Sequence, residues 1–515
     1  MSPPSEPLGS SAVAAWLRSR AGSGAQLRVD SRAVEAGDVF VALPGRRMQG
    51  ADFITAAVRR GAVAVLLDAD GAPAAAGAVP VLAVPGLART LGPVAAEYYG
   101  HPTAQLRTIG ITGTNGKTSS CLWLAQVLAA GGEPCAALGT LGFGIPPDLD
   151  PGLLTTPDAA SVQRLAHVAR DRGARALAME VSSIGLDQGR VDGVRFAVAV
   201  FTNLTRDHLD YHADMAAYAA AKRRLFFWPG LRHAVLNLDD AYGRELAAAL
   251  SDADLPGGPA LTGVATAPAL PPGLRLHCAL RAESIQQGAQ GLGFTLVCER
   301  AGSVQTAAVQ APVIGDFNVA NLLGVIGAAL ACGLSLAQAV RAVATLQAPP
   351  GRLQRVSPAG AATAQPLAIV DYAHTPDAIS KVLRAVRPLV AGNGGRLCIV
   401  LGAGGDRDRG KRPAMAAAAA AADDVVLTSD NPRSEDAEAI LDDLVAGLPA
   451  GLPYRRIADR AAAIRAAVAG ANPCDVVLIA GKGHEEYQEI GGRRLPFSDL
   501  AVAQAALRER SGVQA

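Results

Sequence analysis

The residues best suited to chemistry form a short glycine loop, residues 113–118, with the sequence Gly-Thr-Asn-Gly-Lys-Thr. An apolar run typical of a buried strand, residues 106–112, precedes it, and a helical pattern follows. Backbone N–H groups in such a loop point at phosphate oxygens, and the helix dipole favours the negative charge. Lys117 would neutralise the β- and γ-phosphates of a nucleotide, and the Thr118 hydroxyl would ligate Mg²⁺. The alternative, a tight turn with an incidental lysine, is disfavoured by the strand–loop–helix context.

Two further polar segments follow later strand candidates. Glu180 comes directly after the apolar run at 174–179, and His208 lies in a histidine- and aspartate-rich loop, 202–212, after the run at 196–201. Because ligands of α/β sheets bind beyond the carboxyl ends of the strands, we expect both side chains beside the glycine loop. Taken alone, a His/Asp-rich loop is more often a solvated turn than a metal site. Its place after a strand of the same sheet favours the metal site.

Further motifs extend this pattern along most of the chain. In order, they are Gly-Thr-Asn-Gly-Lys-Thr at 113–118, Met-Glu-Val-Ser-Ser at 179–183, the histidine loop at 202–212, Ala-Lys-Arg-Arg-Leu-Phe at 221–226, Phe-Asn-Val-Ala-Asn at 317–321, Asp-Tyr-Ala-His-Thr-Pro-Asp at 371–377 and Gly-Lys-Gly-His-Glu at 481–485. One such motif would be weak evidence, but the ordered set is specific. From residue 30 to residue 499 the sequence resembles the Mur ligase family.

The resemblance implies an ATP-dependent ligase that joins a nucleotide-linked acid to an amino acid through an acyl phosphate. Two anions, the carboxylate and the γ-phosphate, must then be held together by cations and positioning. By resemblance, the catalytic residues are Lys117, Glu180, His208 and Lys222, and the metal ligands are Thr118, Glu180, His208 and Lys222. Lys222 would act as a carbamate formed with CO₂, because Mg²⁺ prefers oxygen ligands. The alternative for Lys222 is an ordinary exposed lysine on a helix.

The same resemblance assigns the nucleotide contacts and the cofactors, ATP and Mg²⁺. The implied contacts are Gly113, Thr114, Asn115, Gly116, Lys117, Thr118, Ser119, Asn321, Arg352 and Asp371. Among them, the Asp371 carboxylate is expected to reach the ribose hydroxyls.

The first substrate implied by the resemblance is UDP-N-acetylmuramoyl-L-alanyl-D-glutamate. Ser31 matches a uracil or ribose contact, and the loop at 45–53 resembles part of the same site, although Arg46, Arg47 and Met48 replace residues usual in some relatives. Positions that match contacts to the muramoyl dipeptide are Thr155, Thr156, Ser182, Gln188 and Arg190. The guanidinium of Arg190 is a rigid fork for a carboxylate or a pyrophosphate.

The second substrate implied by the resemblance is meso-2,6-diaminopimelate. The segment Asp430, Asn431, Pro432 and Arg433 resembles the signature of enzymes that use this amino acid, and lysine-adding relatives lack its arginine. Diaminopimelate differs from lysine by one carboxylate at the far end, so a guanidinium there would discriminate between them. The implied site is completed by Arg407, Gly481 and Glu485. An Asn-Pro pair also favours a turn, and both interpretations can hold at once.

The fold class predicted is α/β with three domains, since 515 residues exceed what one hydrophobic core supports. Residues 1–105 would form a small uridine-nucleotide-binding domain, 106–347 a central P-loop ATPase-like domain with a parallel sheet, and 348–515 a Rossmann-like domain that binds the amino acid. Buried-strand candidates in the last domain are 367–370, 397–401, 424–427 and 476–480. The Gly- and Pro-rich segment 256–311 predicts a peripheral antiparallel insertion of short strands.

Composition excludes several other classes of protein. A formal net charge of +1 gives no general attraction to nucleic acid or to anionic lipid, and no apolar run approaches the ~20 residues that span a bilayer. The 7 cysteines form no Cys-x-x-Cys pair, so neither a zinc site nor a disulfide framework is indicated. We expect a cytoplasmic monomer. Rival hypotheses are a lysine-adding ligase, a folylpolyglutamate synthase-like ligase and, outside enzymes, a nucleotide-dependent scaffold.

Overall fold

The structure is a computed structural model, and it describes residues 9–45, 49–68, 79–152, 154–209, 211–252, 257–267, 269–288, 290–356, 365–391 and 394–511. The chain divides into two compact units. The first comprises Met1–Ala282, Leu296–Ala307 and Ala320–Ala342, and the second Glu283–Thr295, Ala308–Val319 and Val343–Ala515. The loop residues Arg46, Arg47 and Met48 lie outside the described residues.

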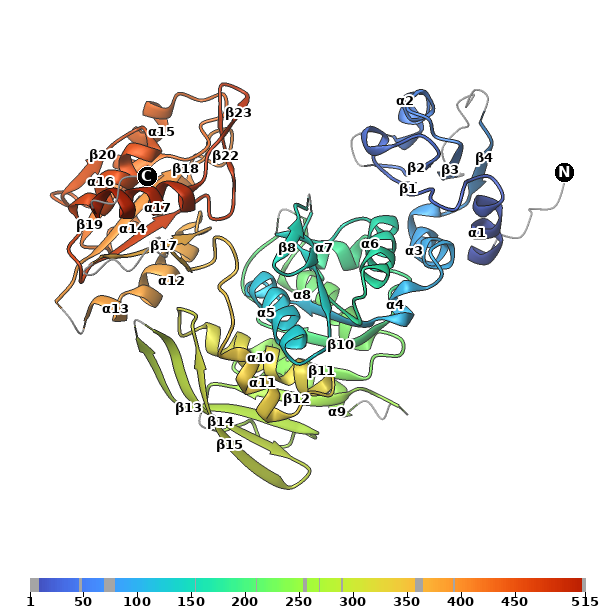
Figure 1. The fold of residues 1–515 in the computed structure, drawn as a ribbon, viewed down its shortest axis with the longest axis horizontal. Helices are drawn as coiled ribbons and strands as arrows, with labels where there is room; N and C mark the ends of the chain where they lie inside the picture. The colour runs from blue at the N-terminus through green and yellow to red at the C-terminus, as the bar shows by residue number, and fades with distance from the viewer. Residues whose placement is uncertain are drawn as a thin grey trace. The chain divides into compact units, whose positions relative to one another are not determined.

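The N-terminal part of the first unit is a 4-stranded parallel sheet in the order β1-β2-β3-β4 (Figure 1). Its elements are α1 (Ser10–Arg18), β1 (Leu27–Arg28), η1 (Ser31–Ala33), β2 (Val39–Ala42), η2 (Gly50–Phe53), α2 (Ile54–Arg59), β3 (Ala64–Asp68), β4 (Val81–Val84), α3 (Leu87–Tyr98) and α4 (Pro102–Gln105). Successive strand residues face opposite sides of the sheet. Val41 therefore packs with Leu17 of α1 and Leu91 of α3, whereas Phe40 packs with Ile54 of α2.

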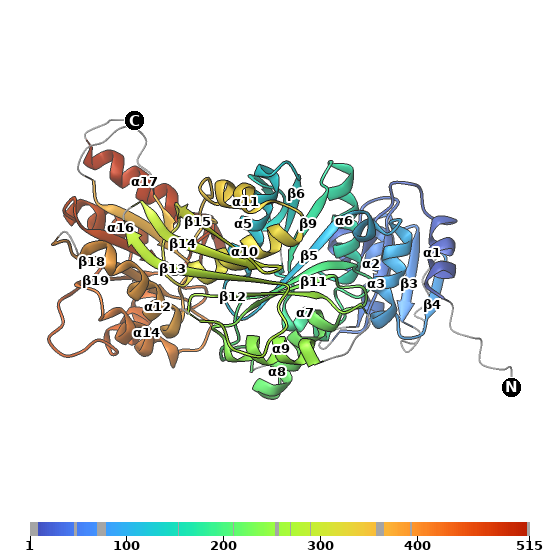
Figure 2. The ribbon, with the colours of Figure 1, turned by 90° about the horizontal axis from the view of Figure 1, so that it is seen from below.

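The central sheet has 11 strands in the order β15-β14-β13-β12-β11-β10-β5-β9-β6-β7-β8. Its elements are β5 (Arg107–Thr112), α5 (Lys117–Ala130), β6 (Cys135–Gly139), β7 (Gly142–Ile145), β8 (Asp148–Asp150), α6 (Ala159–Asp171), β9 (Ala176–Glu180), α7 (Ser183–Asp187), β10 (Phe196–Phe201), α8 (Met215–Arg223), η3 (Arg224–Phe227), β11 (His233–Asn237), α9 (Ala241–Asp252), β12 (Ala260–Ala265), β13 (Cys278–Gly288), β14 (Gly291–Arg300), β15 (Ser303–Ala311), α10 (Asn318–Ala331) and α11 (Leu336–Val343). The strands from β13 to β6 in this order pair in parallel, as predicted for the core of the domain. Figure 2 shows α5 and α10 on one face of the sheet and α8 and α9 on the other.

The predicted insertion at 256–311 is peripheral, but its strands are not short. Here β12 continues the parallel sheet between β11 and β13. The next strands, β13, β14 and β15, are 11, 10 and 9 residues long and lie side by side (Figures 1 and 2). Their short connections permit only antiparallel pairing. The prediction of short strands was wrong because Pro271, Pro272 and Gly273 lie between β12 and β13, and not within the long strands.

The C-terminal sheet has 6 strands in the order β16-β17-β21-β18-β19-β20, and a 2-stranded sheet, β22-β23, accompanies it. Their elements are β16 (Gln354–Arg355), β17 (Leu367–Asp371), α12 (Pro376–Val386), α13 (Pro388–Ala391), β18 (Leu397–Ala403), α14 (Lys411–Ala419), β19 (Asp424–Ser429), α15 (Ala437–Val445), β20 (Tyr454–Arg456), α16 (Arg460–Gly470), β21 (Val476–Ala480), β22 (Tyr487–Ile490), β23 (Arg493–Pro496) and α17 (Asp499–Arg510). All four predicted strands are present.

Helices cover both faces of this C-terminal sheet. Ile399 of β18 packs into a cluster with residues of α12, α14 and α15, and its neighbour Val400 packs into one with residues of α16 and α17. The strands β17, β21, β18, β19 and β20 run parallel, so their carboxyl ends meet at one edge. The predicted α/β fold class is confirmed for the three larger sheets. Among the helices that the structure describes, none is long and apolar enough to cross a membrane.

Candidate active site

The glycine loop connects β5 to α5, as the sequence pattern predicts. Helix α5 begins at Lys117, so Lys117 and Thr118 belong to its first turn with Ser119. Gly113 has φ 151° and Gly116 has φ 84°, and a Cβ atom at Gly113 would lie 1.9 Å from Thr202 Oγ1. The loop conformation therefore requires glycine at these positions.

Residues that follow β10 hold the glycine loop in place. The N–H of Thr114 donates to the Asn203 carbonyl at 2.7 Å, and the N–H of Asn115 donates to Asn203 Oδ1 at 3.0 Å. The hydroxyl of Thr202 donates to the Asn115 carbonyl at 2.6 Å. On the side of α10, Asn321 lies so close that a Cβ atom at Gly116 would be 2.5 Å from its Oδ1. The structure thus brings Asn321 to the loop.

Thr118 and Glu180 lie side by side at the carboxyl ends of β5 and β9. Thr118 Oγ1 donates to Glu180 Oε2 at 3.0 Å, and the Thr140 N–H donates to Glu180 Oε1 at 2.8 Å. Glu180 is buried, with 2% exposure. A hydroxyl and a carboxylate at this distance offer the oxygen ligands that Mg²⁺ prefers.

Two lysines converge on the carbonyl oxygen of Gly113. Lys117 Nζ donates to it at 2.8 Å and Lys222 Nζ at 2.9 Å. Lys222 is buried, contrary to the exposed-lysine alternative. Burial, followed by the charge of Lys117, holds the pKa of Lys222 well below its usual value. A neutral amine is the form that can attack CO₂, so this environment suits carbamate formation.

Tyr218 connects the histidine loop with Lys222, and the sequence interpretation missed it. Its ring centroid lies 6.0 Å from that of His208 and 4.4 Å from Lys222 Nζ, and its hydroxyl lies 3.1 Å from Thr114 Oγ1. Tyr218 and Lys222 are four residues apart on α8, a spacing that places both on one helix face and could have revealed the tyrosine.

Within the described residues, no three His, Cys, Asp or Glu side chains are grouped so that they could hold a metal ion.

The residues predicted to contact the muramoyl dipeptide form a connected polar network. Thr156 Oγ1 donates to the Glu180 carbonyl at 3.0 Å and lies 3.1 Å from Ser182 Oγ. Arg190 donates from Nη1 to the Thr156 carbonyl at 2.9 Å and from Nε and Nη2 to Gln188 Oε1 at 2.9 and 2.6 Å.

Of the two other predicted substrate contacts, Thr155 extends this network and Ser31 lies in another domain. Thr155 Oγ1 lies 3.0 Å from Thr140 Oγ1, and Thr140 in turn bonds the Glu180 carboxylate. Ser31 lies in the N-terminal domain, half-buried at the start of η1, directly after Asp30. The network therefore joins the substrate candidates of the central domain to the proposed metal ligand Glu180.

In the second unit, Asp371 ends β17 with both carboxylate oxygens engaged. They accept the N–H groups of Leu353 and Ala373, each at 2.8 Å. Burial raises the pKa of Asp371. The Arg352 guanidinium lies 5.0 Å from the centroid of the Tyr372 ring, and its buried Nε has no hydrogen-bond partner among the described residues. The side chains of two candidate nucleotide contacts, Arg352 and Asp371, thus lie at the carboxyl end of β17.

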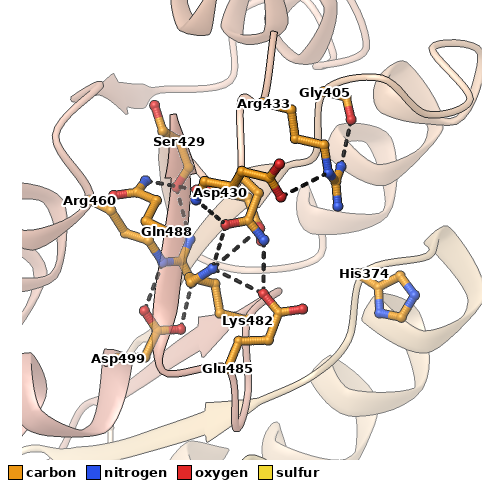
Figure 3. Close-up of polar contacts among 12 residues, drawn as sticks. His374, Gly405, Ser429, Asp430, Arg433, Arg460, Lys482, Glu485, Gln488 and Asp499 are labelled. Atoms are coloured by element: carbon orange, nitrogen blue, oxygen red, sulfur yellow. Dashed lines mark hydrogen bonds and ion pairs between the residues drawn. The ribbon is translucent and has the colours of Figure 1, made fainter. Parts of the chain in front are cut away.

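The amino-acid candidates come from loops at one edge of the C-terminal sheet (Figure 3). The segment 430–433 follows β19, Gly481 and Glu485 follow β21, and Arg407 follows β18. Gly481 has φ 121°, and a Cβ atom there would lie 2.5 Å from Asp430 Oδ2, so only glycine permits this approach. The parallel strands bring together residues that are more than seventy positions apart in the sequence.

Arg433 has an unusual backbone conformation, with φ 55°. Its N–H donates to the Glu489 carbonyl at 2.9 Å, and its carbonyl accepts from the Gly491 N–H at 2.7 Å, so the β22–β23 hairpin fixes the conformation. Its Nη1 donates to the Gly405 carbonyl at 2.5 Å. A Cβ atom at Gly404 would lie 3.1 Å from Arg433 Nη1 and 3.9 Å from Arg407 Cγ, so both arginine side chains lie beside Gly404.

Three family models match successive parts of the chain. They are the Mur ligase family catalytic domain at residues 25–99, the Mur ligase middle domain at 111–329 and the Mur ligase glutamate ligase domain at 351–483.

Individual relatives extend over almost the full chain. A UDP-N-acetylmuramoyl-L-alanyl-D-glutamate--2,6-diaminopimelate ligase of Acidovorax sp. (strain JS42) is 47% identical over 509 residues, which cover 97% of each chain. The protein of the same name from Alkalilimnicola ehrlichii is 49% identical over 496 residues, or 94% of this chain and 95% of the relative. A solved structure with this name is 36% identical, has a TM-score of 0.65 and covers 94% of each chain. This chain belongs to the Mur ligase family.

Proposed function

We propose that this chain adds meso-2,6-diaminopimelate to UDP-N-acetylmuramoyl-L-alanyl-D-glutamate, with conversion of ATP to ADP and phosphate, during synthesis of peptidoglycan precursors. The observation that carries the proposal is the position of Arg433 at the same sheet edge as Asp430, Asn431 and Glu485. A guanidinium and two carboxylates at one sheet edge suit a ligand end that carries both a carboxylate and an ammonium group. The full-length relatives bear the name of this activity.

The proposed reaction has two steps. The terminal carboxylate of the UDP-linked substrate attacks the γ-phosphorus of ATP, and the bond to the bridging oxygen breaks to release ADP. The amine of diaminopimelate then attacks the acyl carbon, loses a proton, and phosphate leaves as the amide forms. Such chemistry depends on holding two anions together and on offsetting their charge. In this chain, the loop N–H groups and Lys117 would serve that purpose.

We further propose that Thr118, Glu180, His208 and carbamylated Lys222 hold Mg²⁺. The 3.0 Å contact between Thr118 and Glu180 supports one pair of oxygen ligands. The burial of Lys222, which lowers the pKa of its amine, supports the carbamate. Bound Mg²⁺ would neutralise phosphate and acyl-phosphate charge. The contacts of Tyr218 with His208 and Lys222 would orient the other two ligands.

The remaining assignments belong to the same proposal. Thr155, Thr156, Ser182, Gln188 and Arg190 would bind the muramoyl dipeptide. Ser31 would contact the uridine, and Asn321, Arg352 and Asp371 the adenine nucleotide. Domain boundaries near residues 105 and 347, a monomeric state and a cytoplasmic location complete it.

The decisive experiment measures phosphate release with the UDP-linked dipeptide and a panel of amino acids. We expect kcat/KM for meso-diaminopimelate to exceed that for L-lysine by ~10⁴-fold, because lysine lacks the carboxylate and offers Arg433 no anionic partner beyond the 3.7 Å contact with Glu489 that the guanidinium already has. Arg433→Ala should lose most of this preference while KM for ATP stays within about twofold of the wild type. Comparable wild-type values for the two amino acids would favour the lysine-adding alternative. Phosphate release without either organic substrate would favour the scaffold hypothesis.

A further inference from the structure

The side chain of Lys482 is a buried ammonium group among the loops that follow β19 and β21 (Figure 3). It has 0% side-chain exposure, and its Nζ lies 2.9 Å from Asn431 Oδ1, 3.1 Å from Glu485 Oε2 and 3.8 Å from Asp430 Oδ1. An ammonium group removed from water requires anions and acceptors around it. All three of these partners are candidates for contact with the amino acid, whereas Lys482 was not a candidate from the sequence.

Lys482 fixes the orientation of the Asn431 amide. Asn431 Oδ1 accepts from Lys482 Nζ and from the Glu489 N–H, each at 2.9 Å. Both partners can only donate, so the oxygen of the amide must face them. The amide nitrogen then faces Glu485, and Nδ2 donates to Glu485 Oε2 at 2.8 Å.

Glu485 is oriented by the same arrangement. Its Oε2 accepts from both Lys482 and Asn431, while Oε1 receives no hydrogen bond from any residue that the structure describes. The side chain is 20% exposed, so it is not sealed from a ligand. Asp430 adds a second carboxylate, and the Lys482 charge offsets one of the two before any ligand binds. The result is an oriented acceptor for a cationic group.

The backbone around these side chains is anchored separately. Arg460 donates to the carbonyls of Ser429 at 3.2 Å and Ala480 at 3.0 Å, which are the last residues of β19 and β21. Its guanidinium also bonds both carboxylate oxygens of Asp499 at 2.7 Å, with both side chains fully buried. Because Arg460 ties the strand ends together, substitution of Lys482 should alter side-chain orientation more than backbone position.

We propose that Lys482 is a positioning residue for the amino-acid substrate, an inference that rests on the proposed function. Its ammonium group holds Asn431 and Glu485 so that Glu485 Oε1 accepts a hydrogen bond from the far-end ammonium group of diaminopimelate. Arg433 then binds the carboxylate at the same end. Lys482 acts through its partners and does not itself contact the substrate.

The test is steady-state kinetics of Lys482→Met, Lys482→Arg and the matched control Lys381→Met, which replaces an exposed lysine on α12. Lys482→Met should raise KM for meso-diaminopimelate by about 10- to 100-fold, the effect of losing hydrogen bonds to a charged group. KM for ATP and for the UDP-linked substrate should stay within about twofold. Lys482→Arg should recover part of the loss, and the control should match the wild type. An unchanged KM for diaminopimelate, or equal increases for all three substrates, would overturn the proposal.

A double-mutant cycle with Glu485→Gln tests whether Lys482 acts on diaminopimelate binding through Glu485. If Lys482 acts by orienting Glu485, the double variant should be no worse than Glu485→Gln alone, whereas independent roles would give multiplied losses. If Lys482→Met alone does not fold, the double variant, which removes both charges, is compared with Glu485→Gln. Wild-type protein that fails to use diaminopimelate would refute the proposed function. If the wild type turns over normally but the losses of the two single variants multiply in the double variant, only the role of Lys482 is refuted.

Discussion

The phosphate loop of the central domain and the amino-acid loops of the C-terminal domain are built differently. The phosphate loop is a continuous segment, 113–118, whose glycines adopt positive φ angles and whose backbone N–H groups at the start of α5 favour a phosphate. The amino-acid loops follow three separate strands, β18, β19 and β21, and present charged side chains. One site is local in the sequence, and the other is assembled by the sheet.

This difference determines what substitutions can change. Backbone N–H groups persist in most variants, so the phosphate loop should respond mainly to loss of its cation or of its glycines. The amino-acid loops depend on a balance of charges, in which the Lys482 ammonium group contacts the carboxylates of Asp430 and Glu485, and Arg433 contacts that of Glu489. Substitutions there should alter substrate preference before they abolish nucleotide use.

The largest effect is expected for Lys117→Ala, which removes the cation of the phosphate loop. Ligation should fall by ~10³-fold, because a preorganised charge near a developing phosphate charge is a major source of rate enhancement. The fold should persist, since Lys117 Nζ donates to carbonyls of the phosphate loop itself, those of Gly113 and Thr114, each at 2.8 Å. Phosphate release and thermal unfolding measure the two outcomes, with Lys381→Ala as the control. Near-normal turnover of Lys117→Ala would show that the nucleotide binds elsewhere.

The contrast also explains which parts were predictable from the sequence. The glycine loop, Glu180 and the segment 430–433 carry their signal within a few neighbouring residues. The strand periodicity located β17, β18, β19 and β21 but not the short parallel edge strand β20. Strand ends were less accurate. The run at 397–401 extends to Ala403 because β18 pairs with β19 as far as Ser429, a constraint that comes from the partner strand.

Other features depend on tertiary structure and could not be derived locally. The sequence of Gly481 to Glu485 includes Lys482, but only the fold shows that its ammonium group is buried between Asn431 and Glu485. Arg460 and Asp499 are 39 positions apart and form a fully buried pair that no local pattern indicates. These residues support a site without belonging to its motif.

A smaller but more diagnostic loss of activity is expected on substitution of Lys222, because the proposed metal site beside the phosphate loop depends on this side chain. Lys222→Ala and Lys222→Arg should both lose about 10²-fold in activity, because neither can form the oxygen ligand that Mg²⁺ prefers. Arginine retains a donor for the Gly113 carbonyl, so it separates this role from the 2.9 Å hydrogen bond. Since burial lowers the pKa of Lys222, more of the amine is neutral at a given pH, and bicarbonate should stimulate the wild type. Retained activity in Lys222→Arg would favour a simple cationic role.

The smallest effect concerns stability in the amino-acid loops, at Glu435. Hydrogen bonds from Arg412, at 2.8 and 3.1 Å, lower the pKa of Glu435 from 4.5 to about 2. A carboxyl whose pKa is lower in the folded state stabilises the fold above its unfolded pKa and loses that contribution as the pH falls through its folded pKa. The difference in unfolding free energy between wild type and Glu435→Gln should therefore be constant above about pH 5 and diminish between about pH 4.5 and pH 2. Urea unfolding at a series of pH values measures it, and a difference independent of pH would show that the Arg412–Glu435 contact contributes through packing and not through charge.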